Sequence, residues 1–280
     1  TGLIDLKNDF KIYWKDFPIA ILIPGKDYLN PEIKLIIDDM IDNEDQLKLI
    51  EYLNGWINKK ISEDLKSLID LKNIKETNTS IRALAYQLYE NNGVIKRDNV
   101  INFIKFLKQD ERKILRGLGV KFGRYHIFLH KLFKPNAVSL RILLWKNFHQ
   151  KYFDLEPPKF GLNFLEDNKN INFNFMLLCG FEKFDNYYVR IDILERLFLK
   201  IMDSNQNNEK EIKLTSEMLN LLGCNKNDFI KLIKKMNYKM RSKNNDFYFK
   251  YFPNKKTKKF VPKKKNNDSP FNVLNELNFK

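Results

Sequence analysis

The sequence predicts a mainly α-helical protein with an N-terminal β-hairpin, a helical middle, a C-terminal winged-helix-like module and a basic tail. Apolar residues recur every three or four positions along most of the chain and alternate only in short stretches, and hydrophobic residues make up 43% of the 280 residues. The expected parts are a β-hairpin element (1–30), a helical domain (31–156), a linker with an apolar run (157–186), a winged-helix-like module (187–252), and a basic tether with a short amphipathic end (253–280).

The N-terminal element is predicted from alternation. Phe10, Ile12 and Trp14 alternate with polar residues, and a turn ending in Pro18 leads to the apolar run 19–23. Two such strands form a hairpin that is too short to be stable alone.

The helical domain is predicted from apolar stripes. The longest stripe covers 47–68, and Gly55 within it costs about 1 kcal/mol relative to Ala, which allows a kink. Shorter stripes cover 81–88, 100–107 and 114–118. These stripes are typical of core-facing helix surfaces.

The block 119–145 combines closely spaced glycines, basic residues and aromatic residues. Asn136 is a candidate cap for the helix that follows Pro135. Interleaved cations and aromatic rings suit a surface that stacks or clamps a nucleic-acid strand. A packed hinge with solvated cations explains the same residues equally well. The candidate strand contacts in this block are Lys121, Arg124, Lys134 and Arg141.

The segment 187–252 has the order of a winged helix. Thr215 and Asn225 are candidate N-caps of two short helices that meet at Gly223, and alternating residues on both sides of Asn244–Asn245 predict a hairpin. The second helix and hairpin carry the candidate nucleic-acid contacts Lys226, Lys231, Lys234, Lys235, Lys239, Arg241 and Lys243.

Positive charge is concentrated near the C-terminus. The segment 226–265 has fifteen basic and two acidic residues, a net charge of +13 within a chain total of +15. Codon bias explains general lysine usage, but it does not explain this placement, so we expect polyanion binding. The tether adds the candidate contacts Lys255, Lys256, Lys258, Lys259, Lys263, Lys264 and Lys265.

No catalytic, metal or cofactor site is predicted in these residues. The chain has no phosphate-binding loop, dinucleotide-binding turn or nucleophile elbow. His126 and His130 lie four positions apart without a third ligand at a convincing spacing, and Cys179 and Cys224 are expected to be buried apolar residues. Two distant cysteines, no membrane-spanning run and no signal peptide favour the cytoplasm. Because Thr1 is not Met, we expect a removed segment or a longer parent.

The segment GVKFGRYHIFLHKLFKP (119–135), followed by LRILLW (140–145), resembles a block in the mitochondrial-degradosome-type DExH-box RNA helicases and their bacterial relatives. Further segments fall in the order that the bacterial relatives show: 81–88, 189–197, 218–224 and 269–271. Together these segments extend along the chain from residue 81 to residue 271.

The resemblance implies an accessory region that follows two motor domains, which in the family bind ATP and Mg²⁺. No residue here matches the family's catalytic residues. The implied partners are a single-stranded or partly duplex nucleic acid (RNA favoured over DNA), upstream motor domains, and a ribonuclease as a further candidate. The alternatives are a protein-docking module of an RNA-processing complex, without direct nucleic-acid contact, and a nuclease with an unrecognised site.

Overall fold

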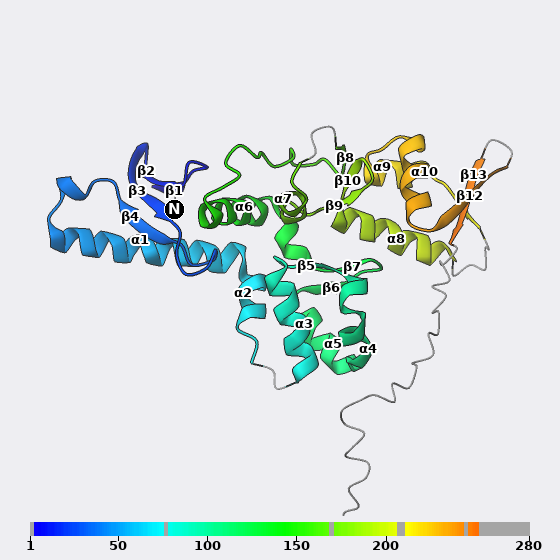
Figure 1. Ribbon diagram of the computed structural model, residues 1–280, viewed down its shortest axis with the longest axis horizontal. Helices are drawn as coiled ribbons and strands as arrows, with labels where there is room; N and C mark the ends of the chain where they lie inside the picture. Colours follow the sequence, from blue (N-terminus) through cyan, green and yellow to red (C-terminus); the bar gives the residue numbers. More distant parts are fainter. Residues whose placement is uncertain (1–2, 76–77, 168–170, 206–210, 244–245, 252–280) are drawn as a thin grey trace, which may run out of the picture.

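The computed structural model describes residues 3–75, 78–167, 171–205, 211–243 and 246–251, which form an elongated molecule (Figure 1). Helices account for about 50% and strands for about 23%, and the strands form four small antiparallel sheets. The prediction of a mainly α protein is therefore wrong, and the fold is mixed α/β. Most strands between the helices have only two to four residues, too few for an alternating pattern to be visible in the sequence.

The N-terminal sheet is an antiparallel meander covered by a long helix. Its strands are β1 (Ile4–Leu6), β2 (Lys11–Trp14), β3 (Phe17–Ile23) and β4 (Glu32–Leu35). The hairpin that alternation predicted corresponds to β2 and β3, and β1 and β4 extend it on both sides. After η1 (Asp38–Met40), helix α1 (Asn43–Asp64) packs against β4 and continues through Gly55.

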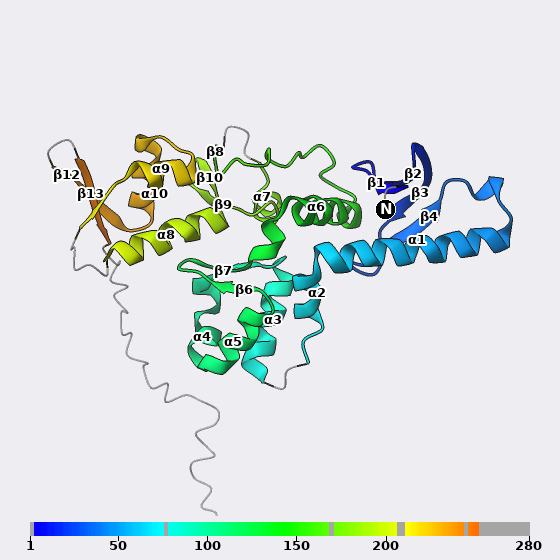
Figure 2. The same cartoon turned by 180° about the vertical axis from the view of Figure 1, so that it is seen from behind.

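A first unit of helices and strands follows. It consists of α3 (Thr79–Glu90), β5 (Val94–Lys96), η2 (Arg97–Val100), α4 (Ile101–Phe106), α5 (Gln109–Gly117), β6 (Val120–Phe122) and β7 (His126–Leu129). The sheet order is β5-β7-β6. Helix α2 (Lys66–Lys72) joins this unit to α1, so the stripe at 47–68 spans two helices. In Figure 2, α3, α4 and α5 project to one side of the long axis of the molecule.

A second unit contains much of the predicted linker. It consists of η3 (His130–Phe133), α6 (Pro135–His149), β8 (Phe164–Glu166), α7 (Phe173–Leu178), β9 (Phe181–Phe184) and β10 (Tyr187–Arg190), with sheet order β8-β10-β9. Helix α6 begins at Pro135 with Lys134 as its N-cap, so Asn136 does not cap it. Proline suits the first helical position because the N–H it lacks would have no helical partner there.

The third unit contains the helices and hairpin expected after residue 187. It consists of α8 (Ile191–Asn205), β11 (Ile212–Lys213), α9 (Ser216–Leu222), α10 (Lys226–Lys235), β12 (Tyr238–Lys243) and β13 (Asp246–Tyr251), with sheet order β11-β13-β12. The Asn225 side chain caps α10 by accepting the Asp228 N–H at 2.9 Å. Gly223 ends α9 in the left-handed conformation. Thr215 is the N-cap residue of α9 but makes no side-chain cap hydrogen bond.

The three units share one connectivity. Each has a helix, a strand, one or two helices and a hairpin, and in each sheet the second hairpin strand lies in the middle. Each hairpin also follows a residue with positive φ: Gly119 (+92°), Gly180 (+92°) and Asn237 (+67°). Such a residue reverses the chain between the last helix and the hairpin. The middle and C-terminal parts of the chain are therefore a tandem series of one structural unit.

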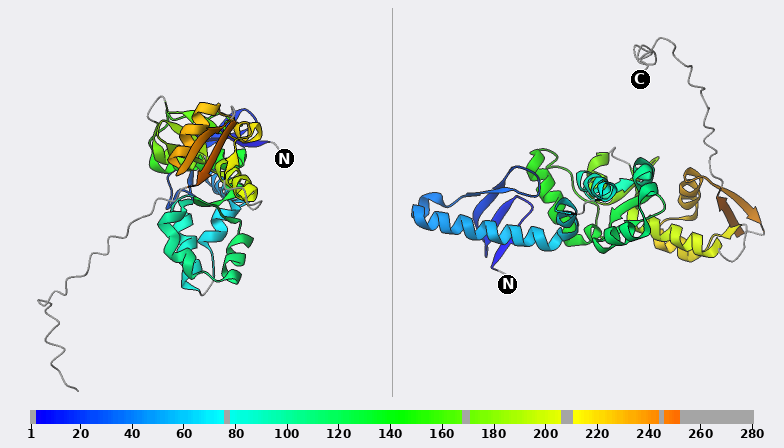
Figure 3. Two further views of the ribbon diagram at one scale, coloured as in Figure 1. Left: turned by 90° about the vertical axis from the view of Figure 1, so that its right-hand side faces the viewer. Right: turned by 90° about the horizontal axis from the view of Figure 1, so that it is seen from below.

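The first two hairpins pack on the third unit. The β6–β7 turn contacts α8 through Glu195, and the β9–β10 turn contacts α10 through an Asp185–Lys235 ion pair of 2.8 Å. The third unit and the N-terminal sheet lie at opposite ends of the long axis (Figure 3). Among the described residues, no further unit follows the β12–β13 hairpin.

Gly180→Ala is expected to lower the free energy of unfolding by about 2 kcal/mol or more. A Cβ atom at this position would lie 2.5 Å from the Phe133 ring, and φ is +92°. Urea unfolding measures the change. The matched control is Gly55→Ala, in the middle of α1 with open space around it, which is expected to gain up to about 1 kcal/mol. Equal effects at the two glycines would contradict the packing argument.

Candidate nucleic-acid interface

The β6–β7 turn approaches helix α8 so closely that only glycine fits at position 123. A Cβ atom on Gly123 would lie 2.4 Å from the Glu195 carboxyl group and 2.7 Å from the His126 carbonyl oxygen. The Gly123 carbonyl accepts a hydrogen bond of 2.7 Å from the Arg97 guanidinium. The Glu195 carboxyl group and the Arg97 guanidinium therefore hold the turn in place.

Glu195 holds this turn through its buried carboxylate, whose residue is only 4% exposed. Its oxygens accept backbone N–H groups from Arg124 (2.5 Å), Tyr125 (2.9 Å) and His126 (2.7 Å). A buried carboxylate is tolerated when hydrogen-bond donors surround it. Three consecutive N–H groups converge on this one because the turn curves around it.

The imidazole of His126 lies between two carboxylates. Nδ1 is 3.2 Å from a carboxylate oxygen of Glu195, and Nε2 is 3.2 Å from a carboxylate oxygen of Glu182. Glu182 also forms an ion pair of 2.9 Å with the Lys96 ammonium. A neutral imidazole carries one N–H, so only the imidazolium donates to both carboxylates. Burial alone would lower the pKa of His126, but the two hydrogen bonds raise it above its ordinary value. This network joins all three units.

Glu182 is the acidic partner with a shifted pKa. Burial would raise the pKa of this carboxyl group, but hydrogen bonds from His126 and Lys96 outweigh burial and lower it. Folding therefore favours the protonated form of His126 and the ionised form of Glu182. His126 contributes stability below its unfolded pKa and loses it as pH rises through the folded pKa. Glu182 contributes stability above its unfolded pKa and loses it as pH falls through the folded pKa.

Two hollows are lined in part by residues of the β6–β7 hairpin. One, of about 380 Å³, is lined by Arg124, Lys96, Lys235 and Phe184. Lys96 and Lys235 there are paired with Glu182 and Asp185. The other, of about 510 Å³, lies between α5, the hairpin and α8. Both volumes are in the range of ligand-binding clefts.

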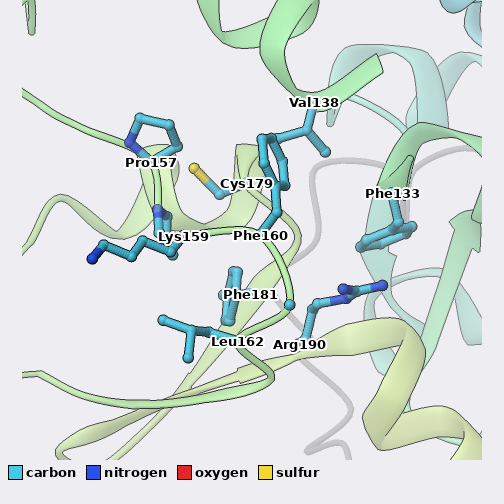
Figure 4. Close-up of a pocket in the computed structure, with 11 residues that line it drawn as sticks. Phe133, Val138, Pro157, Lys159, Phe160, Leu162, Cys179, Phe181 and Arg190 are labelled. Atoms are coloured by element: carbon cyan, nitrogen blue, oxygen red, sulfur yellow. The ribbon is translucent and has the colours of Figure 1, made fainter. Parts of the chain in front are cut away.

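A third hollow lies beneath the segment 157–162 and is too small for a ligand (Figure 4). Its volume is about 20 Å³, which suits roughly one water molecule. Cys179 lines it, and burial raises the pKa of this thiol to about 12. Burial likewise raises the pKa of Cys224 to about 12. Neither thiol is therefore activated as a nucleophile.

The four candidate contacts in the block 119–145 have different environments. Lys121, Arg124 and Lys134 are exposed. The Arg124 guanidinium lies over the Tyr251 ring at 5.1 Å, so it connects the β6–β7 turn to the third unit. Arg141, in contrast, is 0% exposed, and no strand can reach it.

Arg141 is a structural residue. Its guanidinium donates to the carbonyl oxygens of Asn92 (2.7 Å), Leu132 (3.3 Å) and Leu178 (2.6 Å), and burial lowers its pKa to about 10. These carbonyls belong to three separate segments, which the guanidinium crosslinks. Arg141 is therefore packed as the hinge interpretation expects but buried rather than solvated, and it is not part of the candidate interface.

The candidate contacts of the third unit are all exposed, but several have partners within the chain. Lys231 pairs with Asp228, Lys235 with Asp185 and Arg241 with Glu211. Lys239 is also exposed and interacts within the chain. Lys226, Lys234 and Lys243 have no acidic partner among the described residues. One face of α10 therefore packs against the β9–β10 hairpin, and fewer lysines are available than the sequence suggested.

The tether lysines Lys255, Lys256, Lys258, Lys259, Lys263, Lys264 and Lys265 lie outside the described residues. In the described part of the chain, no group of three or more His, Cys, Asp and Glu side chains could hold a metal ion. His126 is buried in β7, whereas His130 is exposed in η3.

Sequence reasoning missed four residues of this region: Arg116, Glu182, Glu195 and Arg196. Their spacing gives no signal, because they lie on three elements far apart in the sequence: Arg116 on α5, Glu182 on β9, and Glu195 and Arg196 on α8. Glu195 and Arg196 fall inside the segment 189–197, which carries part of the resemblance to the helicases but predicts no contact for either side chain.

The comparisons with known proteins found no relative. No protein-family model, curated protein or solved structure matches the chain. Among the helices in the described ranges, none combines the length and apolar character that a bilayer crossing requires.

Raising pH through the His126 pKa is expected to lower the stability of the protein, because the imidazolium then loses the proton that serves one carboxylate. The unfolded pKa is about 6.5, and each unit of pKa difference is worth about 1.4 kcal/mol. Urea unfolding from mildly acidic to mildly alkaline pH measures this loss. His126→Gln removes this dependence, whereas His149→Gln, at an exposed position, keeps it. A stability that does not fall with rising pH would contradict the charged network.

Arg141→Met is expected to cost about 3 kcal/mol of unfolding free energy, because three carbonyl oxygens lose their donor. The folded variant keeps the nucleic-acid affinity of the wild type. Lys134→Met, at the exposed start of the same helix, is the control and is expected to change stability by less than about 0.5 kcal/mol. Reduced affinity with unchanged stability in Arg141→Met would return Arg141 to the interface.

Proposed function

We propose that this chain binds a single strand of nucleic acid, RNA in preference to DNA, as an accessory region beside an ATP-dependent helicase motor. The observation that carries the proposal is the set of exposed cations without acidic partners among the described residues on α10 and β12: Lys226, Lys234 and Lys243. The Lys226 ammonium lies over the Phe247 ring at 3.8 Å, but none of the three cations forms an ion pair that must break before it neutralises a phosphate.

The resemblance of 119–145 to the mitochondrial-degradosome-type helicases supports the motor as partner. In this proposal ATP and Mg²⁺ bind to the motor, the third unit is a winged-helix-type module, a ribonuclease is a further candidate partner, and the protein works in the cytoplasm. The chain itself contributes strand binding and no chemical step. The Glu195-centred network supports this role by fixing the β6–β7 turn, so that the cations beside it keep their positions.

The packing of α10 favours a single strand over a duplex. A recognition helix reads a duplex by lying in the major groove with one face free. Here Lys231 donates to the Tyr187 hydroxyl and Lys235 pairs with Asp185, so one side of α10 is occupied by the second unit. The remaining cations on α10 and β12 suit backbone contacts.

A second candidate function is protein docking through the N-terminal sheet and α1. Large apolar side chains are exposed there, including Phe17 (74%), Met40 (81%) and Leu47 (70%). Exposed apolar residues of this size are typical of protein contacts when they form a patch. A partner held in this way would bind with little dependence on salt.

The test is fluorescence anisotropy of a labelled single-stranded RNA against the full chain across a salt series. We expect the wild type to bind with a steep salt dependence. In the triple variant Lys226→Gln, Lys234→Gln, Lys243→Gln, the log–log slope is expected to be smaller by about 2, at about 0.7 per lost phosphate contact.

The control carries Lys34→Gln, Lys59→Gln and Lys151→Gln, which remove the same charge from exposed positions elsewhere. It is expected to keep the wild-type slope. No binding by the wild type at low salt would exclude the strand-holding function and favour the docking module.

A further inference from the structure

The larger hollow beside the β6–β7 turn has the chemistry of a binding groove. It lies between α5, the hairpin and α8, and it has a volume of about 510 Å³. Its lining includes Arg116, Lys121 and Arg196, which project from three different elements and are all exposed. None of the three has an acidic partner among the described residues.

The carboxylates in this groove are already occupied. Asp192 accepts two hydrogen bonds of 2.7 Å from the Arg190 guanidinium. Glu195 is surrounded by the backbone N–H groups of the hairpin turn. The three cations therefore keep their charge for an anion that enters the groove, and the groove attracts negative charge.

The same groove is also lined by apolar side chains, among them Phe122 and Leu199. Phe122 is half-buried, and the exposed Arg116 guanidinium lies over its ring, 5.6 Å from the ring centre. Arg116 must therefore turn from the ring to a phosphate before a base can lie on this face. Leu199, on α8, is 59% exposed. An aromatic face and an aliphatic side chain close to three cations form a surface for a planar group that carries an anion.

We propose that this groove binds one nucleotide of a single-stranded nucleic acid, with Arg116 and Arg196 on adjacent phosphates and the base against Phe122 and Leu199. The proposal rests on the proposed function and deepens it by assigning a site in which a base is held. Lys121, on the edge strand of the hairpin, attracts the phosphate backbone of the nucleic acid.

A single strand fits this groove better than other polyanions do. The bases of a duplex are stacked within the helix and cannot enter a hollow, whereas an unpaired base can turn out and stack on an aromatic side chain. A run of acidic side chains offers carboxylates but no aromatic ring to stack on Phe122. The volume is also in the range that encloses a small ligand.

The first experiment is a salt series of anisotropy with the full chain and a labelled single-stranded RNA. The variant Arg116→Gln, Arg196→Gln is expected to reduce the log–log slope by about 1.4, because two phosphate contacts are lost. The control is Lys59→Gln, Arg82→Gln, which removes two charges from exposed positions outside the groove and is expected to leave the slope unchanged.

A second measurement tests the base. Phe122→Leu keeps an apolar side chain but removes the aromatic face, and it is expected to weaken RNA binding about tenfold. Photo-crosslinking with an oligonucleotide that contains 5-iodouridine is expected to label Phe122 in the wild type. Affinity for polyphosphate, which lacks bases, is expected to be the same in the wild type and in Phe122→Leu.

The outcomes separate this proposal from the proposed function. A wild type that does not bind RNA contradicts both. A wild type that binds with a slope unchanged in the groove variant, and without a crosslink at Phe122, overturns the groove proposal alone. Tight binding of a labelled poly-glutamate peptide that depends on Arg116 and Arg196, with RNA binding that does not, would assign the groove to an acidic peptide instead.

Discussion

The buried carboxylate of Glu195 is the constraint on which the arrangement of the three units depends. It accepts hydrogen bonds from three consecutive N–H groups of the β6–β7 turn and contacts Nδ1 of the His126 imidazole. Nε2 of the same imidazole faces Glu182. A charge buried in this way is stable only while every donor is in place, because an unpaired buried charge costs several kcal/mol. The first hairpin, β9 and α8 are therefore held in one geometry.

This geometry has consequences for the surface around the turn. Because the Glu195 carboxylate accepts the backbone N–H groups of Arg124 and Tyr125, these groups need neither water nor a ligand as partner, and α8 is held close to the first hairpin. Arg116 and Arg196 thus lie on two walls of one groove although eighty positions separate them in sequence. Arg141 shows the opposite use of a guanidinium, as an internal crosslink between carbonyl oxygens.

The tandem units explain how short strands can be stable. Each sheet has three strands, few longer than four residues, and would be marginal alone. Packing hairpins against other units buries surface that a single unit would leave in water, as in repeat proteins generally. The cost is that the faces used for packing, such as one side of α10, are no longer available to a ligand.

The sequence by itself determined several helices, because an apolar stripe and a cap are local signals: the Asn225 cap, the Gly223 terminus and the stripe of α3 are found where the pattern predicted them. It also determined the concentration of charge near the C-terminus. Tertiary structure decided where the short strands pair, how the unit repeats and which cations are buried or exposed. Pairing between strands and burial of a side chain depend on segments far apart in the chain, so residue type alone could not distinguish the buried Arg141 from the exposed Arg196.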